Sequence, residues 1–152
     1  MPRGRTTRAR ASALKHQEFS RWLGSLVDAQ PNECFLNACV ALLQMEAADA
    51  VYVEGFVALP GEMRAWEHGW LQQGDEVIDP TPLDGDAYYF FGLSRTDEEL
   101  RFLLNRGELF PLYPRIGPFD SERVTWNDAR AAAQEMIDAW LERPPFASPL
   151  LA

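Results

Sequence analysis

Three side chains of the types that cooperate in acyl transfer occur in the order cysteine, histidine, aspartate: Cys34, His68 and Asp79. Cys34 opens a long apolar run, so we expect it in the first turn of a helix, where the positive end of the helix dipole stabilises a thiolate. The neighbouring Glu33 acts in the opposite direction, so Cys34 needs a basic partner. Of the two histidines, His16 lies in a basic N-terminal stretch, and His68 is the stronger candidate.

The turn sequence that follows His68 predicts how this residue can meet a carboxylate. Two short strand-forming runs flank Gln73-Gly74, which predicts a β-hairpin with a two-residue loop at these positions. In that register Asp79 lies directly opposite His68, with the two Cβ atoms about 5 Å apart on one face. The carboxylate can then accept the Nδ1 proton of His68 and leave Nε2 for the thiol. A loop at Gly74-Asp75 would place Thr81 opposite His68 instead.

The same residues also have plainer explanations. A free cysteine is often a small buried hydrophobic residue, which is the interpretation that we favour for Cys39. His68 alone fits a half-buried strand histidine, and Asp79 before a proline fits the start of a turn. Cys34 and His68 lack the short-spaced second ligand pairs typical of zinc sites, so no metal or other cofactor is expected. Trp70 is mainly a core candidate, and on the face of His68 it can also wall a cleft.

The remaining pattern predicts an α+β fold in the order helices, strands, helices. Asn32 is a good N-cap for the helix that begins at Cys34. Thr96 opens a later helix with a capping box, Gly107 closes that helix, and Thr125 caps the last one. The predicted helices cover residues 13–27, 34–45, 96–107 and 126–141, and the predicted strands cover 51–59, 66–72, 75–79 and 88–91.

Charge is distributed unevenly along the chain. The net charge is −9, but residues 1–21 hold six Lys or Arg against one acid, which gives +5. The other residues hold 8 basic and 22 acidic side chains, which gives −14. A body this acidic repels phosphate backbones, so we do not expect it to bind nucleic acid. Residues 1–12 are predicted to be a flexible basic arm, and residues 13–152 a single domain.

The cysteines and the hydropathy pattern favour a reducing, cytoplasmic location. If Cys34 and Cys39 lie on one helix, their axial separation of about 7.5 Å exceeds the roughly 7 Å Cα limit for a disulfide. One or both thiols are then free, as is typical of a reducing compartment. No run approaches the roughly 18 apolar residues of a membrane helix, and the basic N-terminus lacks the apolar segment of a secretory signal.

Four short blocks resemble the core of the transglutaminase-like proteins in the papain-like superfamily, and uncharacterised bacterial and phage proteins with the same order of blocks. In this core a cysteine begins a helix, and a histidine and an aspartate follow on an antiparallel sheet. The resemblance covers about Asn32 to Thr81. The blocks are CFLNA at 34–38, YVEGF at 52–56, EHGW at 67–70 and VIDPT at 77–81.

The resemblance implies a papain-like or transglutaminase-like α+β fold and a thiol enzyme acting on a protein or peptide amide. Cys34 would be the nucleophile, His68 the base and Asp79 the residue that orients it. The backbone N–H of Cys34 would bind the oxyanion, with Gln30 or Asn32 as a second donor, although we favour a helix cap for Asn32. Peptidase, deamidase and amine-transfer activities share this triad and stay open. So does a non-catalytic binding or structural module, such as a phage or host-interaction protein.

Overall fold

The protein has an α+β fold: in the part of the chain that the structure describes, four helices pack against a sheet whose four longer strands are antiparallel. The structure is a computed structural model that describes residues 5–6, 11–12, 14–45, 49–83, 86–112 and 120–142. No helix in these ranges is both long and apolar enough to cross a membrane. The elements are β1 (Arg5–Thr6), β2 (Ala11–Ser12), β3 (Leu14–Lys15), α1 (Gln17–Leu26), α2 (Cys34–Gln44), β4 (Ala50–Ala58), β5 (Trp66–Gln73), β6 (Glu76–Ile78), β7 (Tyr88–Arg95), α3 (Asp97–Asn105) and α4 (Asp120–Glu142).

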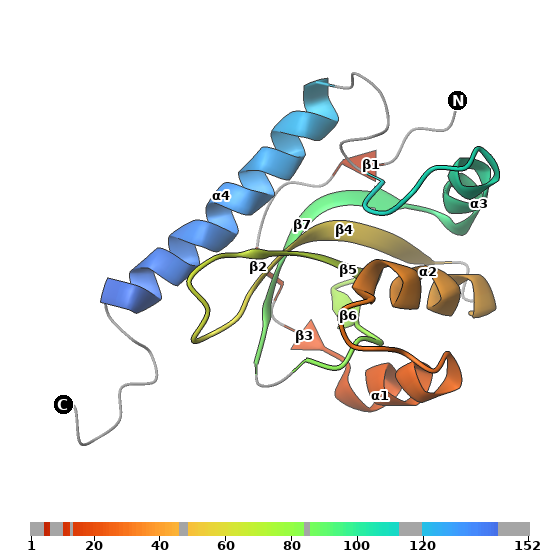
Figure 1. The fold of residues 1–152 in the computed structure, drawn as a ribbon, viewed down its shortest axis with the longest axis horizontal. Helices are drawn as coiled ribbons and strands as arrows, with labels where there is room; N and C mark the ends of the chain where they lie inside the picture. The colour runs from red at the N-terminus through yellow and green to blue at the C-terminus, as the bar shows by residue number, and fades with distance from the viewer. Residues whose placement is uncertain are drawn as a thin grey trace.

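The four longer strands lie in the order β7-β4-β5-β6, and every neighbouring pair is antiparallel. The N-terminal segment connects the two outer strands of this group. In this segment β2 pairs with β7, and β3 pairs in parallel with β6. A single residue separates β2 from β3, so this segment joins β7 to β6. The sheet is curved, and we call the side around which it curls the inner face (Figure 1).

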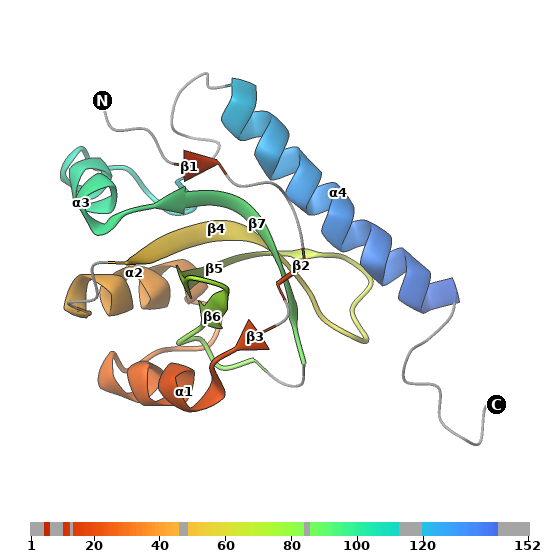
Figure 2. The ribbon, with the colours of Figure 1, turned by 180° about the vertical axis from the view of Figure 1, so that it is seen from behind.

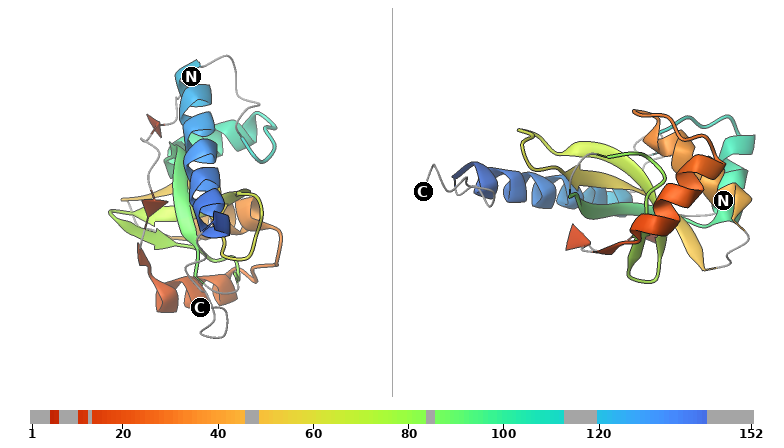
Figure 3. Two further views of the ribbon diagram at one scale, coloured as in Figure 1. Left: turned by 90° about the vertical axis from the view of Figure 1, so that its left-hand side faces the viewer. Right: turned by 90° about the horizontal axis from the view of Figure 1, so that it is seen from below.

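Alternation along the strands divides the core between the two faces of the sheet. On the inner face, aromatic and β-branched side chains pack together. This inner cluster consists of Val53, Val57, Trp70, Val77, Tyr89 and Phe91. The outer face carries the helices: α2 packs on β5 and β4, and α4 packs on β7 and β4. Figures 1 and 2 show α4 along one side and the shorter helices gathered at the other, and Figure 3 gives the same arrangement from two further directions.

Of the predicted basic arm, the structure describes residues 5–6 and 11–12, and the rest of residues 1–12 lies outside the described residues. Residues 5–6 and 11–12 are short strands paired with β7, where a flexible arm was expected. The first helix begins at Gln17, not near residue 13, because residues 14–15 are strand β3. His16 caps this helix, and its Nδ1 accepts a hydrogen bond of 3.1 Å from the backbone N of Phe19. Residues 5–6, 11–12 and 14–15 form strands because they pair with the edge strands β7 and β6. A local sequence pattern does not reveal such pairing partners.

The C-terminal helices follow the prediction in part. Thr96 caps α3 as expected, and its Oγ1 accepts a hydrogen bond of 3.2 Å from the N of Glu99. Gly107, with φ of 79°, follows the end of that helix. The last helix already begins at Asp120, so Thr125 lies inside α4 and is not its cap. Trp126 of α4 packs on Phe56 of the sheet with ring centroids 4.8 Å apart, which fixes this helix on the outer face.

Candidate active site

Cys34 is the first residue of α2, as the sequence predicted, and its side chain is partly exposed. The next residue, Phe35, packs on Gly69 of β5. A Cβ added to Gly69 would lie 2.8 Å from Cδ1 and 3.1 Å from Cα of Phe35. The missing side chain therefore allows the start of α2 to approach the strand. Because His68 is the neighbour of Gly69 in β5, this contact brings the beginning of α2 next to His68.

His68 and Asp79 are in direct contact in the interior of the protein. His68 Nε2 lies 2.7 Å from Asp79 Oδ2, and the two residues are 4% and 2% exposed. The hairpin loop predicted at Gln73-Gly74 is nevertheless wrong. Gln73 pairs with Glu76, so the loop is Gly74-Asp75, the alternative register. Gly74 has φ of 58° at the first loop position, where the type II′ turn favours glycine.

The contact survives the change of register for a geometric reason. The two registers differ by two residues, and side chains two residues apart on a strand point to the same face of the sheet. His68 and Asp79 therefore lie on the same face of the sheet in both registers. In the predicted register they are directly opposed, and in the observed register they are diagonal neighbours. Asp79 also follows the end of β6 at Ile78, so ladder pairing no longer fixes its side chain. The strand predicted for 75–79 is three residues long, from Glu76 to Ile78.

The orientation of the imidazole differs from the prediction. Asp79 holds Nε2 and not Nδ1, which leaves Nδ1 for the thiol of Cys34. Burial alone would lower the pKa of His68. The charge and the hydrogen bond of Asp79 outweigh this effect, and the hydrogen bond and charge of Cys34 add to it, so that the pKa of His68 rises to about 10. At neutral pH the imidazole is therefore held in its protonated form, with a carboxylate on one side and the thiol group on the other.

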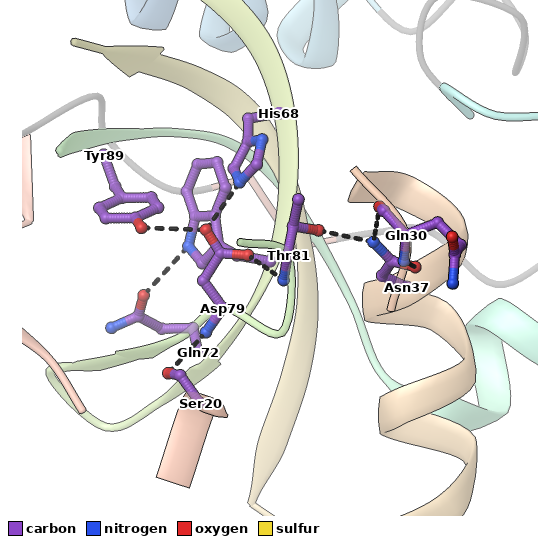
Figure 4. Close-up of polar contacts among 9 residues, drawn as sticks. Ser20, Gln30, Asn37, His68, Gln72, Asp79, Thr81 and Tyr89 are labelled. Carbon is purple, nitrogen blue, oxygen red and sulfur yellow. Dashed lines mark hydrogen bonds and ion pairs between the residues drawn. The ribbon is translucent and has the colours of Figure 1, made fainter. Parts of the chain in front are cut away.

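The carboxylate of Asp79 has a full set of donors (Figure 4). Besides His68, Tyr89 donates its O–H to Oδ2 at 2.9 Å, and the backbone N of Thr81 donates to Oδ1 at 3.0 Å. The backbone N of Asp79 in turn donates to Oγ of Ser20 at 3.0 Å, which ties this residue to α1. Charge-assisted hydrogen bonds of this kind are the stronger ones, and they fix the carboxylate in one orientation. Sequence reasoning treated Tyr89 as a core residue only and did not consider Ser20.

Asn37 is a second polar residue at the site that sequence reasoning missed. It is buried in α2, one turn after Cys34. Its Nδ2 donates to Thr81 Oγ1 at 2.9 Å and to the backbone O of Gln30 at 2.8 Å, while its Oδ1 accepts from the backbone N of Gln30 at 3.2 Å. Asn37 therefore joins the segment before α2 to the segment after β6 (Figure 4). The available signal was an asparagine in an otherwise apolar helix, since buried amides need partners.

The start of α2 offers backbone donors beside the thiol. Glu33 is the N-cap and makes no side-chain capping bond, so the predicted cap role of Asn32 is wrong. Asn32 instead takes a left-handed turn conformation with φ of 68°. Gln30 Nε2 donates to the backbone O of Asp28 at 3.0 Å. The first N–H groups of a helix have no partner within the helix, so that of Cys34 is the suitable donor for an oxyanion.

Two other predictions concern Cys39 and Trp70. Cys39 is a buried free thiol on α2, and burial raises its pKa to about 11, so it is the small core residue that we expected. Trp70 is fully buried, so it does not wall an open cleft. Its ring stacks with that of His68 at a centroid distance of 6.0 Å and meets Tyr89 edge-on at 5.2 Å. Trp70 therefore supports the imidazole from within the inner cluster.

No protein-family model matches the chain, and no curated protein or solved structure matches it either. The resemblance of four short blocks to the transglutaminase-like core therefore stays a prediction from the sequence.

Proposed function

We propose that this protein is a thiol-dependent acyl-transfer enzyme that acts on an amide bond of a protein or peptide. Cys34 is the nucleophile, His68 the general acid and base, and Asp79 the carboxylate that orients His68. The same proposal assigns the fold to the papain-like and transglutaminase-like superfamily. It includes peptidase, deamidase and amine-transfer activities, which share one acylation step.

The observation that carries the proposal is the buried contact of 2.7 Å between His68 and Asp79, with Cys34 acting on the other side of the imidazole. A charged pair in the interior is costly unless it is hydrogen-bonded on all sides, and Asp79 has this full set of donors. Replacing such a pair by apolar residues is often neutral or stabilising, so stability alone is a weak reason for its presence. Perturbed titratable groups beside a nucleophile favour a catalytic role.

In the proposed reaction the Cys34 thiolate attacks the amide carbonyl, and a carbon–sulfur bond forms. The negative charge on the carbonyl oxygen is stabilised by the backbone N–H of Cys34 at the start of α2. His68 gives its proton to the departing nitrogen as the carbon–nitrogen bond breaks, and a thioester remains on Cys34. Water or an amine then attacks the thioester and loses its proton to His68, and the carbon–sulfur bond breaks, which releases the Cys34 thiolate and restores the protonated His68.

A mass-spectrometric assay with p-nitrophenyl acetate tests the acylation step. We expect a burst of p-nitrophenol and an acetyl thioester on Cys34 in the wild-type protein, and neither in Cys34→Ala. His68→Ala should slow acylation by about two orders of magnitude, because general-base catalysis typically contributes that much or more. Cys39→Ala is the matched control: it removes a thiol from the same helix, and acylation should continue at the wild-type rate.

Acylation that stays unchanged in His68→Ala would remove the proposed mechanism. An equally slow reaction of both cysteines in the folded protein would favour the non-catalytic binding module. A vinyl-sulfone probe gives a second reading of the same question, because it labels an activated cysteine without the need for turnover. Addition of an amine such as glycine ethyl ester then separates amine transfer from hydrolysis, since only transfer yields the amide product.

A further inference from the structure

A cavity lies beside Asp79, between α1 and the segment that follows β6. It has a volume of about 470 Å³, in the range of small-molecule pockets, and neither Cys34 nor His68 lines it. One wall is a face of α1, and the opposite wall is the segment from Asp79 to Leu83. The cavity therefore borders the candidate active site at Asp79, whose carboxylate is bound to His68.

Polar groups that can bind an anion gather on the α1 side of this cavity. Gln17, Arg21 and Ser25 follow one another at intervals of four residues, which places them on one face of the helix, and Lys15 of β3 adds a second cation. In the part of the chain that the structure describes, neither Lys15 nor Arg21 forms an ion pair. Asp28 also lines the cavity and is exposed.

The other wall is mostly apolar, and Asp79 is its ionisable residue. Pro80, Pro82 and Leu83 supply its surface. The carboxylate of Asp79 is bound to His68, Tyr89 and the backbone of Thr81, so it does not neutralise the two cations. Within a protein of net charge −9, a pocket with two cations against one free carboxylate is an exception to the overall charge.

We propose that this cavity binds a small molecule with an anionic head group, a carboxylate or a phosphate, and an apolar part. The guanidinium of Arg21 can hold either head group with two parallel hydrogen bonds, and Lys15 adds charge. Gln17 and Ser25 contribute neutral hydrogen-bonding groups. The prolines and Leu83 contact the apolar part of the molecule. Asp79 belongs to both sites, but Cys34 and His68 do not line the cavity, so binding there does not depend on the acyl-transfer reaction.

Isothermal titration calorimetry at constant ionic strength tests the site with three probes: inorganic phosphate, pyrophosphate and succinate. At least one of them should bind the wild-type protein, and Arg21→Gln and Lys15→Gln should each weaken this binding by about tenfold, the size of one charge-assisted hydrogen bond. Arg64→Gln is the matched control, because Arg64 is exposed, lies outside the cavity and carries the same charge. Binding of succinate alone identifies a carboxylate site, and binding of the phosphates alone identifies a phosphate site.

Two results would overturn the proposal. One is the absence of binding of all three probes to the folded wild-type protein at concentrations of about 10 mM, which corresponds to less than roughly 3 kcal/mol of binding free energy. The other is an equal loss of affinity in Arg64→Gln and Arg21→Gln, which would mean general charge attraction. Amide chemical shifts give the location: a probe in the cavity should move the resonances of Gly24, Ser25 and Ala29 more than those of α3.

Discussion

Replacing Asp79 by asparagine separates the charge of the triad from its shape, because the two side chains are nearly isosteric. Asp79 accepts hydrogen bonds at both oxygens: Oδ1 from the N of Thr81 at 3.0 Å, and Oδ2 from His68 at 2.7 Å and Tyr89 at 2.9 Å. Asparagine has one acceptor oxygen and one donor nitrogen. If its oxygen keeps the bond to Thr81, its NH₂ group faces the two former donors.

The expected loss of stability in Asp79→Asn is about 3–5 kcal/mol at neutral pH, the usual cost of removing one partner from a buried pair. The dependence on pH is the sharper test. Because the folded state raises the pKa of His68 from 6.5 to about 10, its protonation stabilises the wild-type protein fully below pH 6.5. This contribution is lost as the pH rises through about 10, with a slope of at most roughly 1.4 kcal/mol per pH unit for one proton.

The same substitution should also impair the reaction at Cys34. Without the carboxylate the imidazole is no longer held in its protonated form, and the asparagine amide, which donates to Nε2, leaves a neutral ring with its proton on Nδ1. Such a ring cannot take the proton of the Cys34 thiol. We expect acylation of Cys34 to fall by two to four orders of magnitude, the range typical of a misplaced general base. The effect is on the chemical step and should persist at temperatures where the variant is fully folded.

Urea denaturation between about pH 6 and pH 9.5 measures the slope, and the p-nitrophenyl acetate assay measures acylation, both against the exposed control Asp86→Asn. The wild-type protein and the control should lose stability as the pH rises across this interval. In Asp79→Asn the part of the slope that His68 contributes should disappear. Equal slopes and equal acylation rates in all three proteins would refute the claim that Asp79 holds His68 in its protonated form.

Three further predictions concern the surroundings of the triad. Gly69→Ala should destabilise the protein by about 1–3 kcal/mol through overpacking and should also slow acylation by roughly tenfold or more, since its Cβ pushes α2 away from β5. Gly92→Ala, whose Cβ would lie 2.7 Å from the backbone O of Glu54, is the control: thermal unfolding should show a similar loss, and the folded variant should acylate normally. Tyr89→Phe removes one donor to the carboxylate and should cost about 1.5–3 kcal/mol in urea denaturation, with activity reduced but measurable. Iodoacetamide at neutral pH should alkylate Cys34 and leave Cys39 unmodified in peptide mass maps, and equal labelling of both in the folded protein would contradict the burial of Cys39.

Much of the fold follows from local signals in the sequence, and the exceptions have a common cause. The apolar run after Cys34, the β-branched run from Val51 and the cap at Thr96 each predicted an element that the structure contains. The short N-terminal strands were missed because they exist only through pairing with β6 and β7. A strand of two residues is too short to show the alternation of apolar and polar residues that indicates a strand, so the local sequence does not predict it.

The candidate site divides in the same way. Cys34, His68 and Asp79 were predicted from residue type and order. His68 and Asp79 are in contact because side chains two residues apart on a strand point to the same face, and the approach of α2 to Gly69 brings Cys34 next to His68. The choice of Nε2 over Nδ1 was not predictable, because it depends on where Asp79 lies after the end of β6. Tyr89 was not assigned a role, since an aromatic residue in an apolar strand looks like core until its hydroxyl partner is known.

The segment just after β6 is the place where the elements of the site are joined. Ser20 of α1 binds the backbone of Asp79, Tyr89 of β7 binds its carboxylate, and Asn37 of α2 binds Thr81. Each bond is buried or nearly so, and each would leave an unpaired polar group if a single partner were removed, at a cost of about 1–3 kcal/mol. A protein that required only a stable core could have apolar side chains at the same positions, which would leave no buried polar group unpaired after a substitution. Three separate elements that converge on two residues beside a buried imidazole are therefore better explained by the need to fix one carboxylate than by the stability of the fold.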